Sequence, residues 1–157
     1  MTTPVEGSGA RPVRLSVVMH MFNVQSYVAQ AVRSVLASSL SDLELILVDD
    51  GSTDDTQRVA TEAAAGDPRV HLVSQANGGA GAARNTGLAR AVGEYLTFAD
   101  ADDLVEPDHY ERAVGLLDRT GSDFCVAGHR RLTRSGEVLP GFGRQLFATQ
   151  RLRITID

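Results

Sequence analysis

The stretch LELILVDDGSTD, residues 43–54, joins an apolar run to an abrupt cluster of acidic and small residues. Its first six residues have the length and the nearly continuous apolar character of a strand that is buried on both faces. Asp49 and Asp50 follow without a spacer, and Gly51 permits a tight turn. The stretch therefore predicts a buried strand that ends in two carboxylates and leads directly into a helix.

The same alternation of strand and helix extends outward in both directions. The predicted strands cover 15–19, 43–48, 69–73, 94–99 and 122–127, and the predicted helices cover about 27–36, 54–65, 82–91 and 107–119. Such alternation is typical of an α/β fold, Rossmann-like, with a mostly parallel sheet and flanking helices. Because right-handed crossovers bring the carboxyl ends of the strands to one edge, we expect ligands to bind there.

Composition excludes several other classes of protein. The 157 residues fit one domain, and a net charge of −5 argues against a general nucleic-acid binder. The single cysteine cannot form an internal disulfide, and the first eleven residues contain no signal-peptide core. No apolar run approaches the roughly 20 residues that span a bilayer. We expect a protein that acts in the cytoplasm or at the inner face of the membrane. Any membrane association would come from regions outside this chain.

The stretch EYLTFADADD, residues 94–103, repeats the pattern of a strand that ends in carboxylates. Three acidic residues within four positions repel one another at neutral pH, and a bound cation relieves that cost. Carboxylate ligands with open positions suit Mg²⁺ or Mn²⁺, with substrate phosphates completing the shell. The alternative is a solvated acidic loop that caps the next helix. We favour a divalent-metal site.

Two further residues at the same predicted edge suggest a nucleotide. The carboxylate of Asp50 can accept hydrogen bonds from the edge of a nucleobase, whereas a simple strand-to-helix turn would not explain two consecutive acids. His20 follows the first predicted strand. A lone histidine is usually structural, but this position favours a place in the wall of a nucleotide pocket.

The Gly-rich stretch NGGAGAARN, residues 77–85, precedes a predicted helix. Backbone amides at a helix start attract phosphate, and Arg84 one turn in can add a charge-assisted bond. The alternative is a flexible loop with Arg84 on a solvated face. The stretch is not a dinucleotide fingerprint, because arginine stands where glycine or alanine is required, and it lacks the phosphate-loop lysine.

Four motifs occur in a characteristic order: VVMHMFN (17–23), VDDGSTD (48–54), NGG with ARNTG (77–79 and 83–87), and GEYLTFADADD (93–103). Over residues 14–130 the set resembles the family 2 glycosyltransferases, which have the GT-A fold. The resemblance implies inverting transfer of a sugar from a nucleoside-diphosphate sugar to a hydroxyl of a carbohydrate or glycan-like acceptor. It also implies a role in cell-envelope polysaccharide synthesis.

The resemblance assigns roles to the nucleotide-binding residues. Asp50 would contact the base with Asp49 beside it, and His20 and Phe22 would flank the base. The family usually leaves its first strand as Pro-x-Tyr-Asn, whereas this chain has HMFN at 20–23. Phe22 therefore keeps the stacking face and loses the hydroxyl.

The resemblance also assigns the diphosphate and metal ligands. Arg84 would lie near the diphosphate, and Asp100 would belong both to the nucleotide site and to the metal site. Asp100 and Asp102 match the D-x-D motif, with Asp102 as the direct ligand of Mg²⁺ or Mn²⁺.

The expected organisation is a disordered lead-in (1–13), a nucleotide-sugar-binding half-domain (14–133), and the start of an incomplete acceptor-side region (134–157). Family members carry a general base in the acceptor-binding half, because inverting attack needs a deprotonated hydroxyl. After Asp123 only Glu137 and Asp157 are acidic, and neither lies in a matching motif. We expect the chain to be truncated at its C-terminus, the base to lie outside it, and isolated transfer to be weak or absent.

Three alternatives stay open at this point. One is a non-catalytic nucleotide-binding module of a larger polymer-synthesising protein. Another is a dinucleotide-dependent oxidoreductase, since Asp100 follows Gly81 at about the spacing of that fingerprint. The third is a phosphatase with Asp100 as nucleophile and Asp102 as acid.

Overall fold

The computed structural model describes residues 12–128, 130–133, 138–139 and 147–148. The chain divides into two compact units, residues 1–107 and residues 108–157. Almost all of the predicted lead-in, as well as Glu137 and Asp157, lies outside the described residues.

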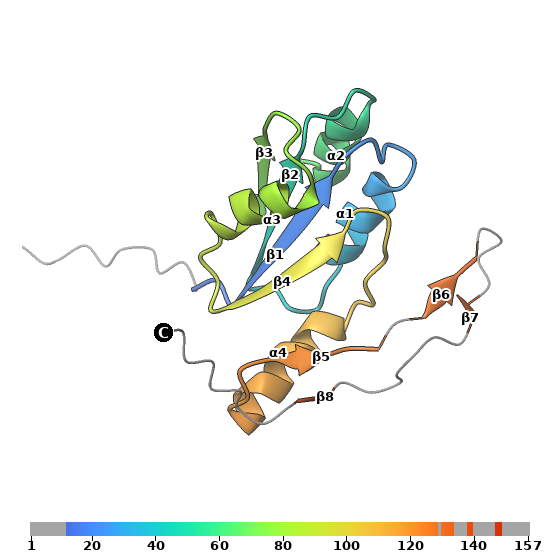
Figure 1. The fold of residues 1–157 in the computed structure, drawn as a ribbon. Helices are drawn as coiled ribbons and strands as arrows, with labels where there is room; N and C mark the ends of the chain where they lie inside the picture. Colours follow the sequence, from blue (N-terminus) through green and yellow to red (C-terminus); the bar gives the residue numbers. More distant parts are fainter. Residues whose placement is uncertain (1–11, 129, 134–137, 140–146, 149–157) are drawn as a thin grey trace, which may run out of the picture. The chain divides into compact units, whose positions relative to one another are not determined.

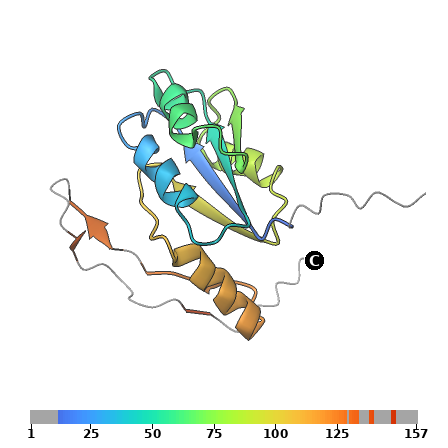
Figure 2. The same ribbon diagram turned by 180° about the vertical axis from the view of Figure 1, so that it is seen from behind.

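The first unit alternates strand and helix, as the sequence predicts (Figure 1). Its elements are β1 (Leu15–Met21), α1 (Val28–Leu36), β2 (Leu43–Asp49), α2 (Thr56–Ala64), β3 (Val70–Ser74), α3 (Ala80–Leu88) and β4 (Tyr95–Asp100). The four strands are parallel and lie in the order β3-β2-β1-β4. Helices α1 and α2 cover one face of the sheet, and α3 covers the other (Figures 1 and 2). The predicted α/β fold is confirmed.

The two central strands form the core of the sheet. Every residue of β2 is buried, as its continuous apolar run predicts, and all of β1 except His20 is buried. The edge strand β4 alternates between partly and more exposed residues, with Leu96 39% and Phe98 45% exposed. Val18 pairs with Phe98 in register, so these two side chains share the face that α3 covers only in part.

A buried polar cluster fixes the amino-terminal side of the sheet. Glu44 is 4% exposed, and its Oε1 accepts hydrogen bonds from Ser16 Oγ at 2.5 Å and from the Val92 amide at 2.8 Å. Ser16 Oγ in turn accepts the Gly93 amide at 2.8 Å. Since buried carboxylates are tolerated only with such partners, this cluster holds the turn before β4 against β1 and β2.

In its described residues, the second unit contains α4 (His109–Thr120) and four two-residue strands, β5 (Cys125–Val126), β6 (Arg131–Leu132), β7 (Val138–Leu139) and β8 (Phe147–Ala148). The predicted strand 122–127 is thus much shorter. It does not extend the parallel sheet, because its backbone pairs antiparallel with β8, which comes from a later segment of the chain. Among the described residues, none of the helices combines the length and the hydropathy that a membrane span requires.

Helix α3 packs closely against β1, and this contact generates a prediction. A Cβ at Gly87 would clash with the Val18 side chain, whereas a Cβ at Gly81, on the same helix, would meet nothing within 4 Å. We expect Gly87→Ala to lower the free energy of unfolding by about 1–3 kcal/mol through overpacking. We expect Gly81→Ala to leave it unchanged or to raise it by up to about 1 kcal/mol. Denaturant unfolding checks both variants, and equal shifts would contradict the packing of α3.

Candidate functional site

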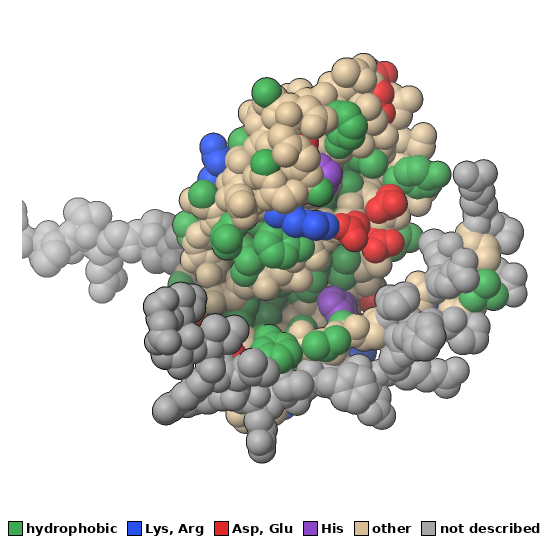
Figure 3. Space-filling model, viewed as in Figure 1, with side chains coloured by type: hydrophobic (Ala, Val, Ile, Leu, Met, Phe, Trp, Pro, Cys, Tyr) green, Lys and Arg blue, Asp and Glu red, His purple; other side chains and the backbone are tan. Residues whose placement is uncertain are grey.

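The carboxyl ends of β2, β1 and β4 lie side by side. Met21 is in register with Asp49, and His20 is in register with Asp100. The Asp50 amide then donates to the Met21 carbonyl at 2.9 Å. The expectation that the two acidic clusters meet at one edge is confirmed, and Figure 3 shows acidic and cationic side chains gathered beside the ends of β1 and β4.

His20 lies within β1, whereas the sequence places it just past the strand. It pairs with Val48 on one side and with Asp100 on the other. The strand continues through it because both neighbouring strands offer partners as far as that position.

Asp50 is a buried anchor for the Gly-rich loop. Its side chain is 1% exposed, and its oxygens accept hydrogen bonds from Gln75 Nε2 at 2.7 Å, the Gly78 amide at 2.9 Å and the Gly79 amide at 2.8 Å. The hydrogen bond from the Gly78 amide is the largest cause that lowers the pKa of Asp50 below its ordinary 3.8. Burial raises the pKa, and the hydrogen bonds from Gln75 and Gly79 lower it further. Asp50 therefore stays ionised and fixes the start of α3.

This arrangement changes the expected role of the Gly-rich loop. The sequence suggests that its amides receive phosphate, but the Gly78 and Gly79 amides receive the carboxylate of Asp50. An anion of the chain itself thus occupies them, as the electrostatics of a helix start favour. Contact of Asp50 with a nucleobase stays a prediction. Gln75 was not identified from the sequence, since a polar residue after β3 carries no distinctive signal.

Two buried polar atoms at this edge have no hydrogen-bond partner within the described part of the chain: His20 Nε2 and Asp49 Oδ1. His20 Nε2 lies 4.0 Å from Asp50 Oδ2, beyond hydrogen-bonding distance. Asp49 is only 3% exposed. Because buried polar atoms in native proteins are nearly always paired, these two point to a place where ligand or water binds. Phe22, which is 39% exposed, is the first residue of the loop that follows β1.

The loops after β1 and β2 are joined by hydrogen bonds that sequence reasoning missed. Asn23 adopts a left-handed φ of 52°, which asparagine tolerates better than most residues, and its Oδ1 accepts the Thr53 amide at 2.8 Å. The Val24 amide donates to Thr56 Oγ1 at 2.7 Å. The run of hydroxyl and carboxylate residues after Gly51 is the signal that could have revealed them. These bonds hold Phe22 next to the end of β2.

Arg84 of α3 reaches the end of β4. Its Nη2 lies 3.1 Å from Asp100 Oδ1, and its Cζ lies 5.9 Å from the centroid of the Phe98 ring. The two charged side chains are 42% and 60% exposed. Asp102 follows in the exposed turn after β4. The structure thus brings Arg84 to Asp100, the first carboxylate of the D-x-D motif, with Asp102 two residues further along the chain.

The metal ligands can be tested against the known preferences of divalent cations. Within the described ranges, no group of three or more His, Cys, Asp or Glu side chains is placed to hold a metal ion. Mg²⁺ is usually bound by one or two carboxylates together with water and substrate phosphates. Asp100 and Asp102 supply the two carboxylates that such an ion would need, and their role as its ligands stays a prediction.

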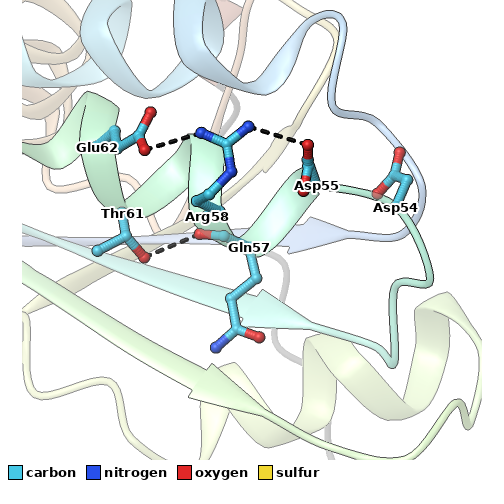
Figure 4. A pocket seen from close by; sticks show the side chains of 6 residues that line it. All are labelled: Asp54, Asp55, Gln57, Arg58, Thr61 and Glu62. Atoms are coloured by element: carbon cyan, nitrogen blue, oxygen red, sulfur yellow. Dashed lines mark hydrogen bonds and ion pairs between the residues drawn. The ribbon is translucent and has the colours of Figure 1, made fainter.

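A second group of charged residues lies along α2, around a shallow hollow (Figure 4). There Arg58 donates to Asp55 Oδ2 at 2.9 Å and to Glu62 Oε1 at 2.8 Å. All of its lining residues come from α2 and the turn before it, and its one cation, Arg58, is already paired with Asp55 and Glu62. This hollow offers no convergence of separate strands, so we place the functional site at the sheet edge.

The sequence matches Glycosyl transferase family 2 over residues 16–146. The chain belongs to this family. Among its relatives are an uncharacterized glycosyltransferase, EpsJ, of Bacillus subtilis, 40% identical over 73% of the chain, and the chondroitin synthase of Escherichia coli, 34% identical over 88% of the chain. The chain spans 33% of the first relative and 20% of the second.

Solved structures agree with this membership of family 2. A mannosyltransferase of Pyrobaculum calidifontis, in complex with GDP-Man and Mn²⁺, has a TM-score of 0.68 and 27% identity, covering 78% of this chain and 36% of its own. TarS of S. aureus, in complex with UDP-GlcNAc, has a TM-score of 0.67 and 27% identity, covering 73% of this chain and 33% of its own. The fold is thus the GT-A fold. Membership favours a transferase over the oxidoreductase and the phosphatase.

The buried carboxylate of Asp50 generates a prediction for this family 2 chain. Asp50→Asn keeps the size of the side chain but removes the charge that the three N–H groups face. We expect a loss of about 1–3 kcal/mol in the free energy of unfolding at neutral pH. Because the pKa of Asp50 is lowered in the folded protein, this contribution is complete above the ordinary value of 3.8 and is lost as pH falls through the lower folded value.

Denaturant unfolding between pH 7 and pH 3 measures this contribution. Asp102→Asn is the control, since it neutralises an exposed aspartate in the turn after β4 and should leave stability unchanged. Equal stability of the Asp50→Asn variant and the wild type at neutral pH would contradict the anchoring role.

Proposed function

We propose that the chain binds the nucleoside-diphosphate part of a sugar donor at the carboxyl edge of β1, β2 and β4. The observation that carries this proposal is the register that brings the ends of these strands together, with Asp49 opposite Met21 and Asp100 opposite His20. The solved relatives with GDP-Man and Mn²⁺ or with UDP-GlcNAc support a nucleotide sugar as the ligand.

The base would lie against the loop after β1. The Phe22 ring is exposed there and offers an aromatic face for stacking. His20 Nε2 and Asp49 Oδ1, which lack partners, supply polar contacts for the base or its ribose, with Asp50 beside them. These four residues form the nucleoside part of the proposed site.

The diphosphate would lie against the end of β4. Asp100 and Asp102 would hold Mg²⁺ or Mn²⁺ there, and the bound ion would offset the charge that develops on the leaving diphosphate. Arg84, whose guanidinium lies at the same place, adds a second positive charge. Both contributions favour departure of the diphosphate.

In the whole protein, we propose inverting transfer of the sugar to a hydroxyl of a carbohydrate or glycan-like acceptor, in cell-envelope polysaccharide synthesis. The site would act in the cytoplasm or at the inner face of the membrane. Inversion needs a base that deprotonates the acceptor, and the motifs of this chain supply none. Residues outside the chain would provide it, so the 157-residue chain alone would bind the donor and transfer sugar weakly.

Calorimetry of the 157-residue chain with UDP, GDP, CDP and dTDP, with and without Mn²⁺, tests the binding proposal. We expect at least one nucleotide to bind, with affinity about tenfold or more higher when Mn²⁺ is present, since the ion links phosphate to carboxylate. Asp102→Asn should remove that enhancement. Glu62→Gln, which removes the same charge from α2, should retain it.

A folded chain that binds none of the four nucleotides would refute the proposal. Nucleotide binding without any sugar transfer by the longer protein would instead favour a non-catalytic module.

A further inference from the structure

The ion pair between Arg84 and Asp100 involves a carboxylate that two cations would compete for. Arg84 is the cation that faces Asp100 at 3.1 Å, and Asp100 is also a proposed ligand of the divalent ion. A guanidinium and a metal ion cannot both lie against one carboxylate oxygen without repelling each other. The positive charge of Arg84 therefore weakens metal binding at Asp100 unless Arg84 moves or finds a second anion.

We propose that Arg84 is an exchangeable counter-ion, which pairs with Asp100 in the absence of nucleotide and transfers to the diphosphate when the metal–nucleotide complex binds. This inference rests on the proposed function, because it takes the nucleoside diphosphate as the ligand. It adds an order to binding: metal alone binds weakly, and metal and nucleotide bind together.

Exposure shows that the pair can open. The side chains of Arg84 and Asp100 are 42% and 60% exposed, so each regains water when they separate, and the pair is weak and screened by salt. Asp50 differs, since it is 1% exposed and accepts three N–H groups, so its release would leave a buried charge without partners. Of these two carboxylates, Asp100 is the one suited to exchange partners.

The surroundings of Arg84 also suit a movement of the side chain alone. Its guanidinium lies over the ring of Phe98, 5.9 Å from the centroid, an arrangement that stabilises a cation while leaving its N–H groups available. Its backbone belongs to α3, which packs on β1 and β2 through Ala83 and Gly87. Rotation of the Arg84 side chain can therefore redirect the charge without moving the helix.

The diphosphate resolves the competition for Asp100. Its oxygens give the guanidinium a bidentate partner that is stronger than a single carboxylate contact, and they also complete the shell of the metal. Metal and nucleotide then strengthen each other's binding, and by linkage the coupling is equal in both directions. Without nucleotide, the positive charge of Arg84 opposes the metal.

The test measures two affinities whose changes have opposite signs. Mn²⁺ binding to the chain without nucleotide is followed by electron paramagnetic resonance of the free ion, and nucleotide binding at saturating Mn²⁺ is followed by calorimetry. Arg84→Gln should strengthen the binding of Mn²⁺ alone about two- to fivefold, the range expected from loss of an exposed ion pair. It should weaken nucleotide binding about tenfold or more, through loss of a charge-assisted phosphate contact.

Two further variants serve as controls. Arg58→Gln causes the same change in net charge on α2, where Arg58 also pairs with carboxylates, and should change neither affinity. Arg84→Lys keeps the charge and loses the fork, so Mn²⁺ alone should bind as in the wild type while nucleotide binds more weakly. Circular dichroism confirms that each variant is folded.

The possible failures are distinguishable. If Arg84→Gln leaves the binding of Mn²⁺ alone unchanged, or shifts both affinities in the same direction, the exchange is refuted although the nucleotide site stands. If the wild type binds no nucleotide with Mn²⁺, the proposed function fails, whatever the variant does with the metal.

Discussion

The parallel pairing of β1 with β2 on one side and with β4 on the other is the constraint on which the site depends. β1 and β2 are buried on both faces by α1, α2 and α3, and a slip of one residue would turn each side chain to the opposite face, so that Val18 would no longer pack against Gly87. That register alone brings Asp49 and Asp100, far apart in sequence, to opposite sides of β1. Burial of apolar surface therefore fixes the geometry of a polar site.

Carboxylates at this edge exist in two different states. Asp50 is buried and holds the loop before α3, whereas Asp100 is exposed to solvent and pairs with Arg84. The first state makes a rigid wall, because removing its partners would leave an unpaired charge. In the proposed exchange, the second gives up Arg84 and binds a metal ion. A donor site needs both, a fixed frame for the nucleoside and an adaptable end for the diphosphate.

Local patterns account for what the sequence predicts. The apolar run of β2 and the acids that follow it are adjacent in the chain, so both the strand and its functional end can be recognised. The contact of Gln75 with Asp50 and the antiparallel pairing of β5 with β8 depend on segments far apart in sequence, and no local pattern encodes them. The sequence likewise places Arg84 near a phosphate, but its pairing with Asp100 depends on how α3 lies beside β4.

Paramagnetic relaxation by Mn²⁺ tests the central claim most directly. With Mn²⁺ and a nucleoside diphosphate bound to the chain, the account predicts the strongest broadening of amide signals around Asp100, Asp102 and Arg84, and the weakest at the amino ends of the same strands. Broadening centred on Asp55 and Glu62 of α2, or on Leu15 and Leu43, would contradict it, because the metal would then lie away from the carboxyl edge of the sheet.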